Sequence, residues 1–189
     1  RLEGMPKMPG SVALDNIYID NIAASHAAVE YLIERGHHKI GMLTSHEGPA
    51  RFREIGYREA LQAHNIPIEN HLLSSGAYSE DGGYQAMKQL LSLETHPTAI
   101  FAANDLMAMG AMLAIREANL SIPDDIAVMG FDDIPTAKLV YPALTTIAQF
   151  QRNLGQRAAE MLMERLGGHA PNMGRSEAMP YKLIVRESA

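Results

Sequence analysis

Residues 126–149 read IAVMGFDDIPTAKLVYPALTTIAQ, and the rest of the sequence can be organised around this stretch. Its opening apolar run is typical of a buried strand, which breaks at Gly130. Two carboxylates, Asp132 and Asp133, follow directly, and a linker then leads to a second extended piece at 144–147. Open α/β sheets bind ligands beyond the carboxyl ends of their strands. A strand that is followed by acids therefore indicates a ligand-binding edge of such a sheet.

Strand and helix patterns alternate on the N-terminal side of this stretch. The predicted strands are 39–43, 72–74, 97–103 and 126–130, and the predicted helices are 21–35, 50–64, 80–93 and 106–119. Strands that alternate with helices predict right-handed βαβ units and a parallel sheet. The expected fold class is therefore α/β, a three-layer αβα sandwich around a parallel sheet.

Helical spacing also predicts which side chains face the core. In the helix at 50–64 the predicted inward side chains are Phe52, Ile55, Ala60 and Leu61. A further helix at 151–166 carries an apolar stripe made of Leu154, Ala158, Met161, Leu162 and Leu166.

The two ends of the chain fit this pattern less well. Residues 12–19 resemble a strand, but no obvious partner for them follows, and a strand needs partners. Residues 169–178 are polar and contain glycine, which predicts a loop, and a closing strand is expected at 181–185. We therefore expect a fragment whose N-terminal part is missing.

Composition narrows the class of protein. The chain has 189 residues, of which 47% are hydrophobic and 20% charged, as is usual for globular proteins. The sequence contains no cysteine, which excludes disulfides, zinc–thiolate sites and thiol nucleophiles. We see no signal peptide and no apolar run long enough to span a membrane. The net charge of −6 makes this part of the protein a poor surface for nucleic acid.

Polar side chains follow each predicted strand at the expected ligand edge. They are Ser45, His46, Glu47, Arg51 and Arg53, then Tyr78 and Ser79, then Asn104 and Asp105, and finally Asp132 and Asp133. Arginine supplies paired donors, whereas amides and carboxylates supply acceptors. A sugar needs such a mixture, because it combines an apolar face with hydroxyl groups that both donate and accept.

Each of these side chains also has a purely structural explanation. Arg53 could pair with Glu54 or Glu59 on an exposed helix face. Asn104 or Asp105 could simply cap the next helix. The tyrosine could be a packed loop residue, and the two acids could be turn residues.

Signals for metal binding or catalysis are weak. None of the eight histidines has the spacing of a metal site, and the phosphate-binding and nucleophile-elbow motifs are missing. We expect no metal, no cofactor and no enzymatic activity.

Several longer segments carry a family resemblance, among them PTAIFAANDLMAMGAM, IPDDIAVMGFDDI and YPALTTIAQ. The matching segments are 19–43, 51–61, 82–91, 97–112, 122–134, 141–149, 154–166 and 183–188. In these the chain resembles the effector-binding domain of bacterial LacI/GalR-type transcription repressors, which have the type I periplasmic-binding-protein fold.

The resemblance implies two subdomains that are joined by three crossover segments, with a small effector between them. Residues 1–20 would be a remnant of the N-terminal subdomain and the first crossover, and 21–131 the C-terminal effector-binding subdomain. Residues 132–168 would hold the second crossover and a helix of the N-terminal subdomain. Residues 169–189 would return to form the final strand of the C-terminal subdomain.

The resemblance also implies roles for five residues. Arg53 matches an arginine that clamps the effector, and Tyr78 matches an aromatic that lines the pocket. Asn104 matches a hydroxyl-binding amide, Asp132 a carboxylate that holds hydroxyls or amines, and Gln149 a residue near the hinge and the pocket.

The expected protein is the effector-sensing domain of a cytoplasmic, homodimeric repressor. Its partners would be a small polar effector such as a sugar and, through a headpiece outside this chain, operator DNA; no membrane is involved. One rival is a sugar-binding protein of an ABC transporter with the same fold. The other is an enzyme of doubly wound fold that uses Asp132 and a histidine.

Overall fold

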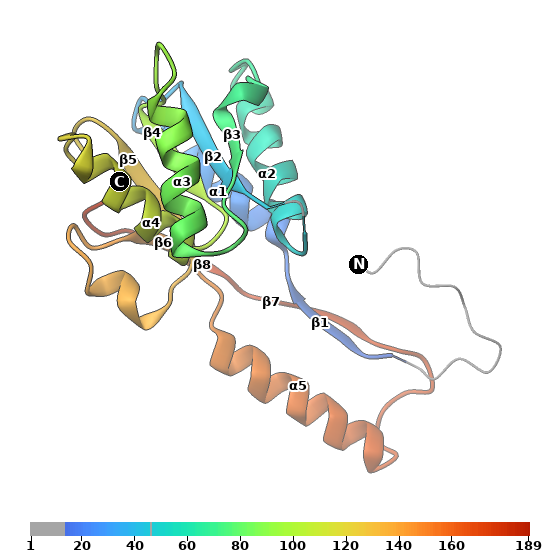
Figure 1. The fold of residues 1–189 in the computed structure, drawn as a ribbon. Helices are drawn as coiled ribbons and strands as arrows, with labels where there is room; N and C mark the ends of the chain where they lie inside the picture. Colours follow the sequence, from blue (N-terminus) through green and yellow to red (C-terminus); the bar gives the residue numbers. More distant parts are fainter. Residues whose placement is uncertain (1–13, 46) are drawn as a thin grey trace. The chain divides into compact units, whose positions relative to one another are not determined.

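The computed structural model describes residues 14–45 and 47–189 (Figure 1). Its helices are α1 (Asn21–Glu34), α2 (Ala50–Ala63), α3 (Glu80–Leu91), α4 (Asp105–Glu117) and α5 (Gln151–Leu166). Its strands are β1 (Asn16–Ile19), β2 (Ile40–Thr44), β3 (Leu73–Ser75), β4 (Ala99–Ala102), β5 (Ala127–Asp132), β6 (Thr145–Ala148), β7 (Ser176–Met179) and β8 (Lys182–Ile184). Short 3-10 helices occupy Asn70–Leu72 and Pro135–Lys138. The candidate His46 and the first residues of the predicted strand 12–19 lie outside the described residues.

The described chain divides into two compact units. Unit 2 comprises Ile19–Phe150 together with Pro180–Ala189. Unit 1 comprises Gln151–Met179 together with the described residues up to Tyr18. Both units are therefore assembled from two separate segments of the sequence.

Unit 2 is built on one six-stranded sheet in the order β3-β2-β4-β5-β6-β8. The first five strands run parallel, and β8 pairs antiparallel with β6 at the edge. Strands β2, β4 and β6 are buried along their whole length, as expected for strands that are covered on both faces. The predicted α/β class with a mostly parallel sheet is confirmed.

Helices cover both faces of this sheet (Figure 1). Helices α1 and α2 pack against each other on one face, and α3 packs against α4 on the other. This division follows from right-handed crossovers, since the chain moves in opposite directions along the sheet after β2 and after β3. The α1–α2 contact is close enough that a Cβ atom on Gly56 would lie 2.2 Å from the carbonyl oxygen of Ile22.

The last residues of the chain complete unit 2. Ser188 lies against two strands, because its carbonyl oxygen accepts a hydrogen bond from the amide of Val128 at 2.7 Å. Its hydroxyl accepts from the amide of Thr145 at 2.8 Å and donates to the carbonyl of Val128 at 2.6 Å. On α1, the hydroxyl of Tyr31 donates to the carbonyl of Ala189 at 3.0 Å.

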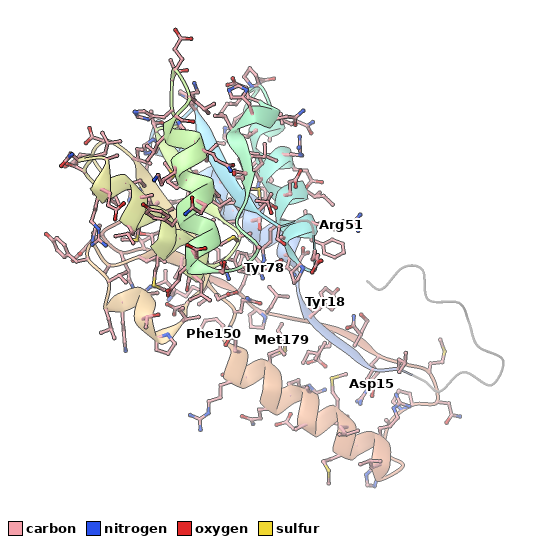
Figure 2. All side chains as sticks on the ribbon, in the orientation of Figure 1. Asp15, Tyr18, Arg51, Tyr78, Phe150 and Met179 are labelled. Atoms are coloured by element: carbon pink, nitrogen blue, oxygen red, sulfur yellow. The ribbon has the colours of Figure 1, made fainter. Side chains whose placement is uncertain are left out.

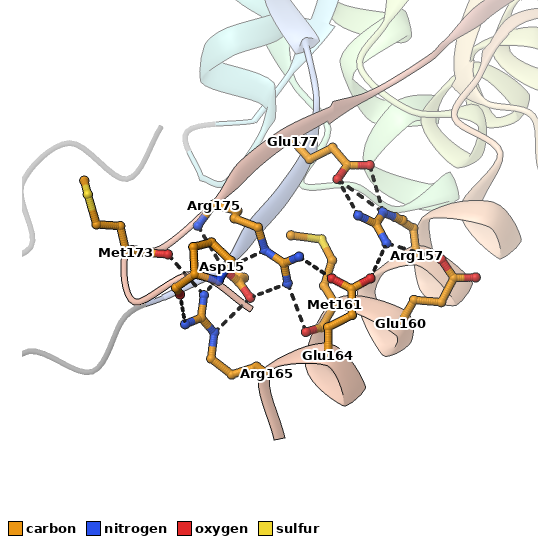
Figure 3. A network of polar contacts seen from close by, with 10 residues as sticks. Asp15, Arg157, Glu160, Met161, Glu164, Arg165, Met173, Arg175 and Glu177 are labelled. Carbon is orange, nitrogen blue, oxygen red and sulfur yellow. Dashed lines mark hydrogen bonds and ion pairs between the residues drawn. The ribbon is translucent and has the colours of Figure 1, made fainter. Parts of the chain in front are cut away.

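Unit 1 consists of α5 and a two-stranded ribbon of β1 and β7. A network of ion pairs connects the helix to the ribbon (Figure 3). Arg165 and Arg175 both bind Asp15, at 2.6 Å and 2.9 Å. Hydrogen bonds from these two guanidinium groups hold the pKa of Asp15 well below its usual range. The remaining members of the network are Arg157, Glu160, Glu164 and Glu177.

The prediction of a loop throughout 169–178 is wrong at its end. Ser176–Met179 forms β7, and this strand supplies the partner that the sequence did not reveal for the strand-like run ending at Ile19. The two strands are about 160 residues apart, as in the hydrogen bond from Asn16 Nδ2 to Ser176 Oγ. The four residues of β7, Ser-Glu-Ala-Met, are too few and too mixed to identify a strand without this distant partner.

The predicted inward face of α2 is also partly wrong. Phe52 and Ile55 are 44% and 42% exposed, whereas Arg53 on the same helix is only 4% exposed. The buried face of α2 therefore includes an arginine, and its other members are Ala50, Gly56, Tyr57, Ala60 and Leu61. On α5, Met161 is buried, but Leu162 and Leu166 are exposed. No helix within residues 14–45 and 47–189 combines the length and the apolar character that a membrane span needs.

Candidate functional site

Arg53 and Asp132 form a charged pair beyond the carboxyl ends of the parallel strands. Arg53 comes from the first turns of α2, and Asp132 ends β5. Their Nη1 and Oδ1 atoms are 3.6 Å apart, and both side chains are largely withdrawn from solvent. The sequence predicted both residues for this edge, and the structure brings them together.

Neighbouring residues fix the guanidinium group of Arg53 on three sides. Its Nε donates to Asn21 Oδ1 at 2.9 Å, and its Nη1 donates to the carbonyl of Ala103. The ring of Phe131 lies beneath it, with the ring centre 3.7 Å from the guanidinium carbon. Burial lowers the pKa of Arg53 and Asp132 opposes that shift. The side chain keeps its charge, because the ordinary pKa of arginine is far above neutral pH.

Asp132 sits in an unusual backbone conformation. Its φ angle is 125°, and that of Asp133 is 55°. Positive φ angles at residues other than glycine cost on the order of 1–3 kcal/mol each and persist where the surrounding structure enforces them. Burial raises the pKa of Asp132 to about 6, although the charge of Arg53 acts in the opposite direction.

Gln149 joins this pair from the end of β6. Its Nε2 donates a hydrogen bond to Asp132 Oδ1. The contact follows from the β5–β6 register, which pairs Asp132 with Ala148, the residue directly before Gln149.

Asn104 and Tyr78 form a second hydrogen-bonded group beside Arg53. The Oδ1 of Asn104 accepts from the amide of Met107 at 2.9 Å and so caps α4, while its Nδ2 donates to the carbonyl of Tyr78 at 3.2 Å. The structural explanation of Asn104 as a helix cap is thus confirmed. The two groups adjoin, because Arg53 binds the carbonyl of Ala103, which precedes Asn104.

Tyr78 follows β3 and is labelled in Figure 2. Its hydroxyl accepts from the amide of Ala50 at 2.6 Å and donates to the carbonyl of Glu47 at 3.0 Å. The phenol therefore ties the start of α2 to the segment before it. Burial raises the pKa of Tyr78, so the hydroxyl stays protonated at neutral pH.

The structural explanation of Arg53 as a partner of Glu54 or Glu59 is wrong. Glu54 pairs instead with Arg58, at 2.9 Å. Arg53 occupies the inward face of α2, where its only close carboxylate among the described residues is Asp132.

Sequence reasoning missed two residues that shape this site. Asn21 looks like a helix-start residue, but Asp20 provides the cap of α1, which leaves the Asn21 amide for Arg53. Phe131 reads as a strand residue, and only the folded structure shows that its ring lies against the cation of Arg53. An aromatic directly before the acidic pair was the one available signal.

Within residues 14–45 and 47–189, no three or more acidic or histidine side chains gather in a way that could hold a metal ion. The side chains of the site supply fixed hydrogen-bond donors and acceptors. They combine a permanent cation, a carboxylate with a shifted pKa, two amides and a phenol.

A family model described as the periplasmic binding protein-like domain matches residues 29–189. The chain belongs to this family. Within the family, its relatives are LacI-family regulators, as the resemblance implied. A putative LacI-family regulator from Sanguibacter keddieii has a TM-score of 0.87 and 34% identity, with 98% of this chain and 70% of that one covered. The complex of the transcriptional regulator CelR with cellobiose has a TM-score of 0.90 and 32% identity, covering 99% of this chain and 56% of that one.

Curated LacI-family relatives include the repressor PurR of Mannheimia succiniciproducens, 35% identical over 92% of this chain. Another is the repressor CytR of Escherichia coli, 36% identical over 93% of this chain. The chain spans about half the length of these relatives, since it covers 52% of each. They are transcriptional repressors, which confirms the expected non-enzymatic class and does not favour the transporter rival.

Proposed function

We propose that this chain is the effector-sensing part of a DNA-binding transcription repressor and that a small polar effector binds at Arg53 and Asp132. One observation carries the proposal. Among the described residues Arg53 Nη2 donates no hydrogen bond and Asp132 Oδ2 accepts none, although both side chains are largely buried. Neither atom is sealed from solvent, since Ser25 Oγ is the buried side-chain atom without a partner among the described residues, so a ligand could reach both.

The effector that fits these groups is a sugar or a related polar metabolite. A hydroxyl group can donate to the free oxygen of Asp132 and accept from the free nitrogen of Arg53, so one diol could satisfy both. The similar regulator CelR is bound to cellobiose in its complex, which supports this class of compound.

The other three predicted residues would complete the site in different ways. Gln149 would hold Asp132 in place and present its remaining amide atoms to the effector. The Nδ2 of Asn104 already donates to Tyr78, and its Oδ1 already accepts from the first turn of α4. Asn104 would therefore bind the effector through the second lone pair of its Oδ1. Tyr78 would offer its ring, because its hydroxyl is already bonded on both sides.

Unit 1 would represent the N-terminal subdomain and unit 2 the C-terminal one. The proposed division is residues 1–20, 21–131, 132–168 and 169–189, with crossovers near each boundary. The effector would favour one arrangement of the two subdomains over another, and it can shift that equilibrium only by its difference in affinity for the two arrangements.

The proposed partners follow from the class of the relatives. Operator DNA would be bound by a headpiece outside these 189 residues, and the repressor would act in the cytoplasm. A second copy of the chain would dock on unit 2, where Leu113, Leu139 and Tyr141 are 45%, 75% and 80% exposed. Arg116 links this surface together by donating to the carbonyl of Tyr141 at 3.2 Å.

A thermal-shift screen with calorimetry tests the proposed site. The panel consists of cellobiose, glucose 6-phosphate and guanine, which represent sugars, sugar phosphates and nucleobases. We expect at least one compound to raise the melting temperature, and Arg53→Ala and Asp132→Ala each to weaken its binding by at least about tenfold. Arg58→Ala is the matched control, since it removes an arginine–carboxylate pair from the exposed side of α2. Unchanged affinity in both site variants would reject the assignment.

A further inference from the structure

The turn that carries Asp132 is held by residues that do not belong to the proposed effector contacts. Asp132 and Asp133 both have positive φ angles, and neither is glycine. Such a conformation relaxes unless contacts from elsewhere in the fold hold it. The contacts that hold this turn therefore determine where the Asp132 carboxylate points.

Asp105 fixes the far side of this turn. It is fully buried at the start of α4, and its Oδ2 accepts from the amide of Ile134 at 2.9 Å. Its Oδ1 accepts from the hydroxyl of Thr146 on β6 at 2.6 Å. The carboxylate also lies directly against β5, because a Cβ atom on Gly130 would be 2.2 Å from Oδ1.

Arg186 fixes the turn itself. Its Nη2 donates to Asp133 Oδ1 at 2.6 Å, and its Nη1 donates to the carbonyl of Leu144 at 2.8 Å. Its own backbone amide donates to Thr145 Oγ1 at 3.0 Å. Arg186 thus attaches the second acid of the turn to the start of β6, through one bond to Asp133 and two bonds to Leu144 and Thr145.

The two acids of the turn therefore have different tasks. Asp132 is 3.6 Å from Arg53, whereas the partner of Asp133 is Arg186. With Asp133 attached to β6 and Ile134 attached to α4, the chain between β5 and the crossover cannot rotate freely. Of the two acids in this turn, Asp132 is the one whose side chain is directed at the guanidinium group of Arg53.

We propose that Arg186 is a positioning residue for the effector site: through Asp133 it holds the turn in the conformation that directs Asp132 toward Arg53. Its link to effector binding rests on the proposed function. Its effect on Asp132 itself does not, and a measurement without any ligand can test it.

The first experiment measures the pKa of Asp132 by carboxyl carbon NMR on the 189-residue chain. Asp132→Asn identifies its signal. Burial raises this pKa to about 6, against the opposing influence of Arg53 and Gln149 and together with the charge of Asp105. If the turn relaxes, the carboxyl group moves into water, and its pKa falls by about one unit or more toward the ordinary value.

Two variants remove the ion pair between Arg186 and Asp133. Arg186→Gln removes its cation, and Asp133→Ala removes its anion. Both variants should lower the pKa of Asp132, so a loss of folding in one still leaves the other as a test. Arg58→Gln, which breaks the pair with Glu54, should leave the pKa unchanged. A folded Arg186→Gln or Asp133→Ala variant in which Asp132 titrates as in the parent chain overturns the proposal. A purely structural role of Arg186 would lower the unfolding free energy without moving this pKa.

The second experiment is a double-mutant cycle on binding. The probe is whichever of cellobiose, glucose 6-phosphate and guanine raises the melting temperature most. Arg186→Gln should weaken its binding about tenfold in the parent chain and should cause no further loss in the Asp132→Asn background. An equal loss in both backgrounds would show that Arg186 acts independently of Asp132 and would overturn the proposal. If Asp132→Asn alone leaves binding unchanged, the proposed function fails, and the NMR titration still decides the role of Arg186.

Discussion

The hydroxyl oxygen of Tyr78 lies 2.6 Å from the backbone nitrogen of Ala50, so a side chain that follows β3 satisfies a free amide at the start of α2. Pro49 directly precedes this helix, and no side chain of the helix's own N-terminal residues caps it. The phenol therefore takes the place that a serine or aspartate cap occupies in other helices.

Tyr78→Phe removes this contact and keeps the ring. The Ala50 amide and the Glu47 carbonyl then lose a partner, so we expect a loss of about 1 kcal/mol in unfolding free energy. Because Arg53 lies in the first turn of α2, effector binding should also weaken, by a few-fold. Urea denaturation and calorimetry measure the two effects. Binding and stability both equal to those of the parent chain would show that the contact is not formed in solution.

The raised pKa of Asp132 predicts a specific pH dependence of stability. A carboxyl group whose pKa rises from 3.8 in the unfolded chain to about 6 in the folded chain favours folding in its protonated form. That contribution is fully present below pH 3.8 and is lost as the pH rises through about 6. Asp132→Asn introduces a side chain of the same shape as protonated aspartic acid, and this side chain stays uncharged at every pH. The variant should therefore be about 1–3 kcal/mol more stable than the parent chain at about pH 7.5 and about equally stable near pH 4.

Urea denaturation at both pH values tests this expectation. Asp105 also has a pKa raised by burial, but it is present in both proteins, so the difference between them isolates Asp132. A variant that is less stable than the parent chain at the higher pH would mean that the pair with Arg53 outweighs the cost of burying the charge.

Gly56→Ala tests the contact between α1 and α2. The new methyl group would lie 2.2 Å from the Ile22 carbonyl, and backbone atoms cannot give way as a flexible side chain can. We expect a loss of about 1–3 kcal/mol or more in unfolding free energy. Gly155→Ala on α5 is the control, because nothing lies within 4 Å of its Cβ position. It should be neutral or raise helix stability by about 0.5–1 kcal/mol. Equal thermal denaturation of both variants would contradict the close approach of the two helices.

Tyr57→Phe tests a buried hydrogen bond in the core of unit 2. The Tyr57 side chain is fully buried, and its hydroxyl donates to the carbonyl of Ile40 at 2.8 Å. Without the hydroxyl, the Ile40 carbonyl loses its partner at a site that water cannot reach. We expect the unfolding free energy to fall by about 1–3 kcal/mol. Tyr84→Phe is the matched control, since the Tyr84 hydroxyl binds Glu117 at an exposed site. Chemical denaturation should show a clear loss for the first variant and little change for the second.

The elements of unit 2 were predictable because their signals are local. Buried strands such as β4 and β5 are apolar, and helices begin at residues that cap them, such as Asp20 and Asn104. The sequence order of strands and helices then fixes the parallel sheet and its polar edge. Asp132 could be placed at that edge for the same reason.

The features that could not be predicted depend on contacts between distant segments of the sequence. Strand β7 exists through its pairing with β1, and the burial of Arg53 depends on Asn21, Ala103 and Phe131. A prediction from helical spacing places Phe52 rather than Arg53 in the core, because it assigns apolar side chains to the buried face. The division of labour between Asp132 and Asp133 likewise appears only when Arg186 is in place.

The discontinuous path of unit 2 has a consequence for how the protein is made. The amides of Val128 and Thr145 find their hydrogen-bond acceptors only in Ser188, and β6 gains its second neighbour only with Lys182–Ile184. The ribosome synthesises these residues after α5 and β7. During synthesis, residues 19–150 therefore form a sheet in which the edge of β6 has no partner strand. Exposed strand edges are sites of unwanted pairing. We therefore expect nascent chains that stall before residue 180, and chains from which residues 180–189 are removed, to expose the edge of β6.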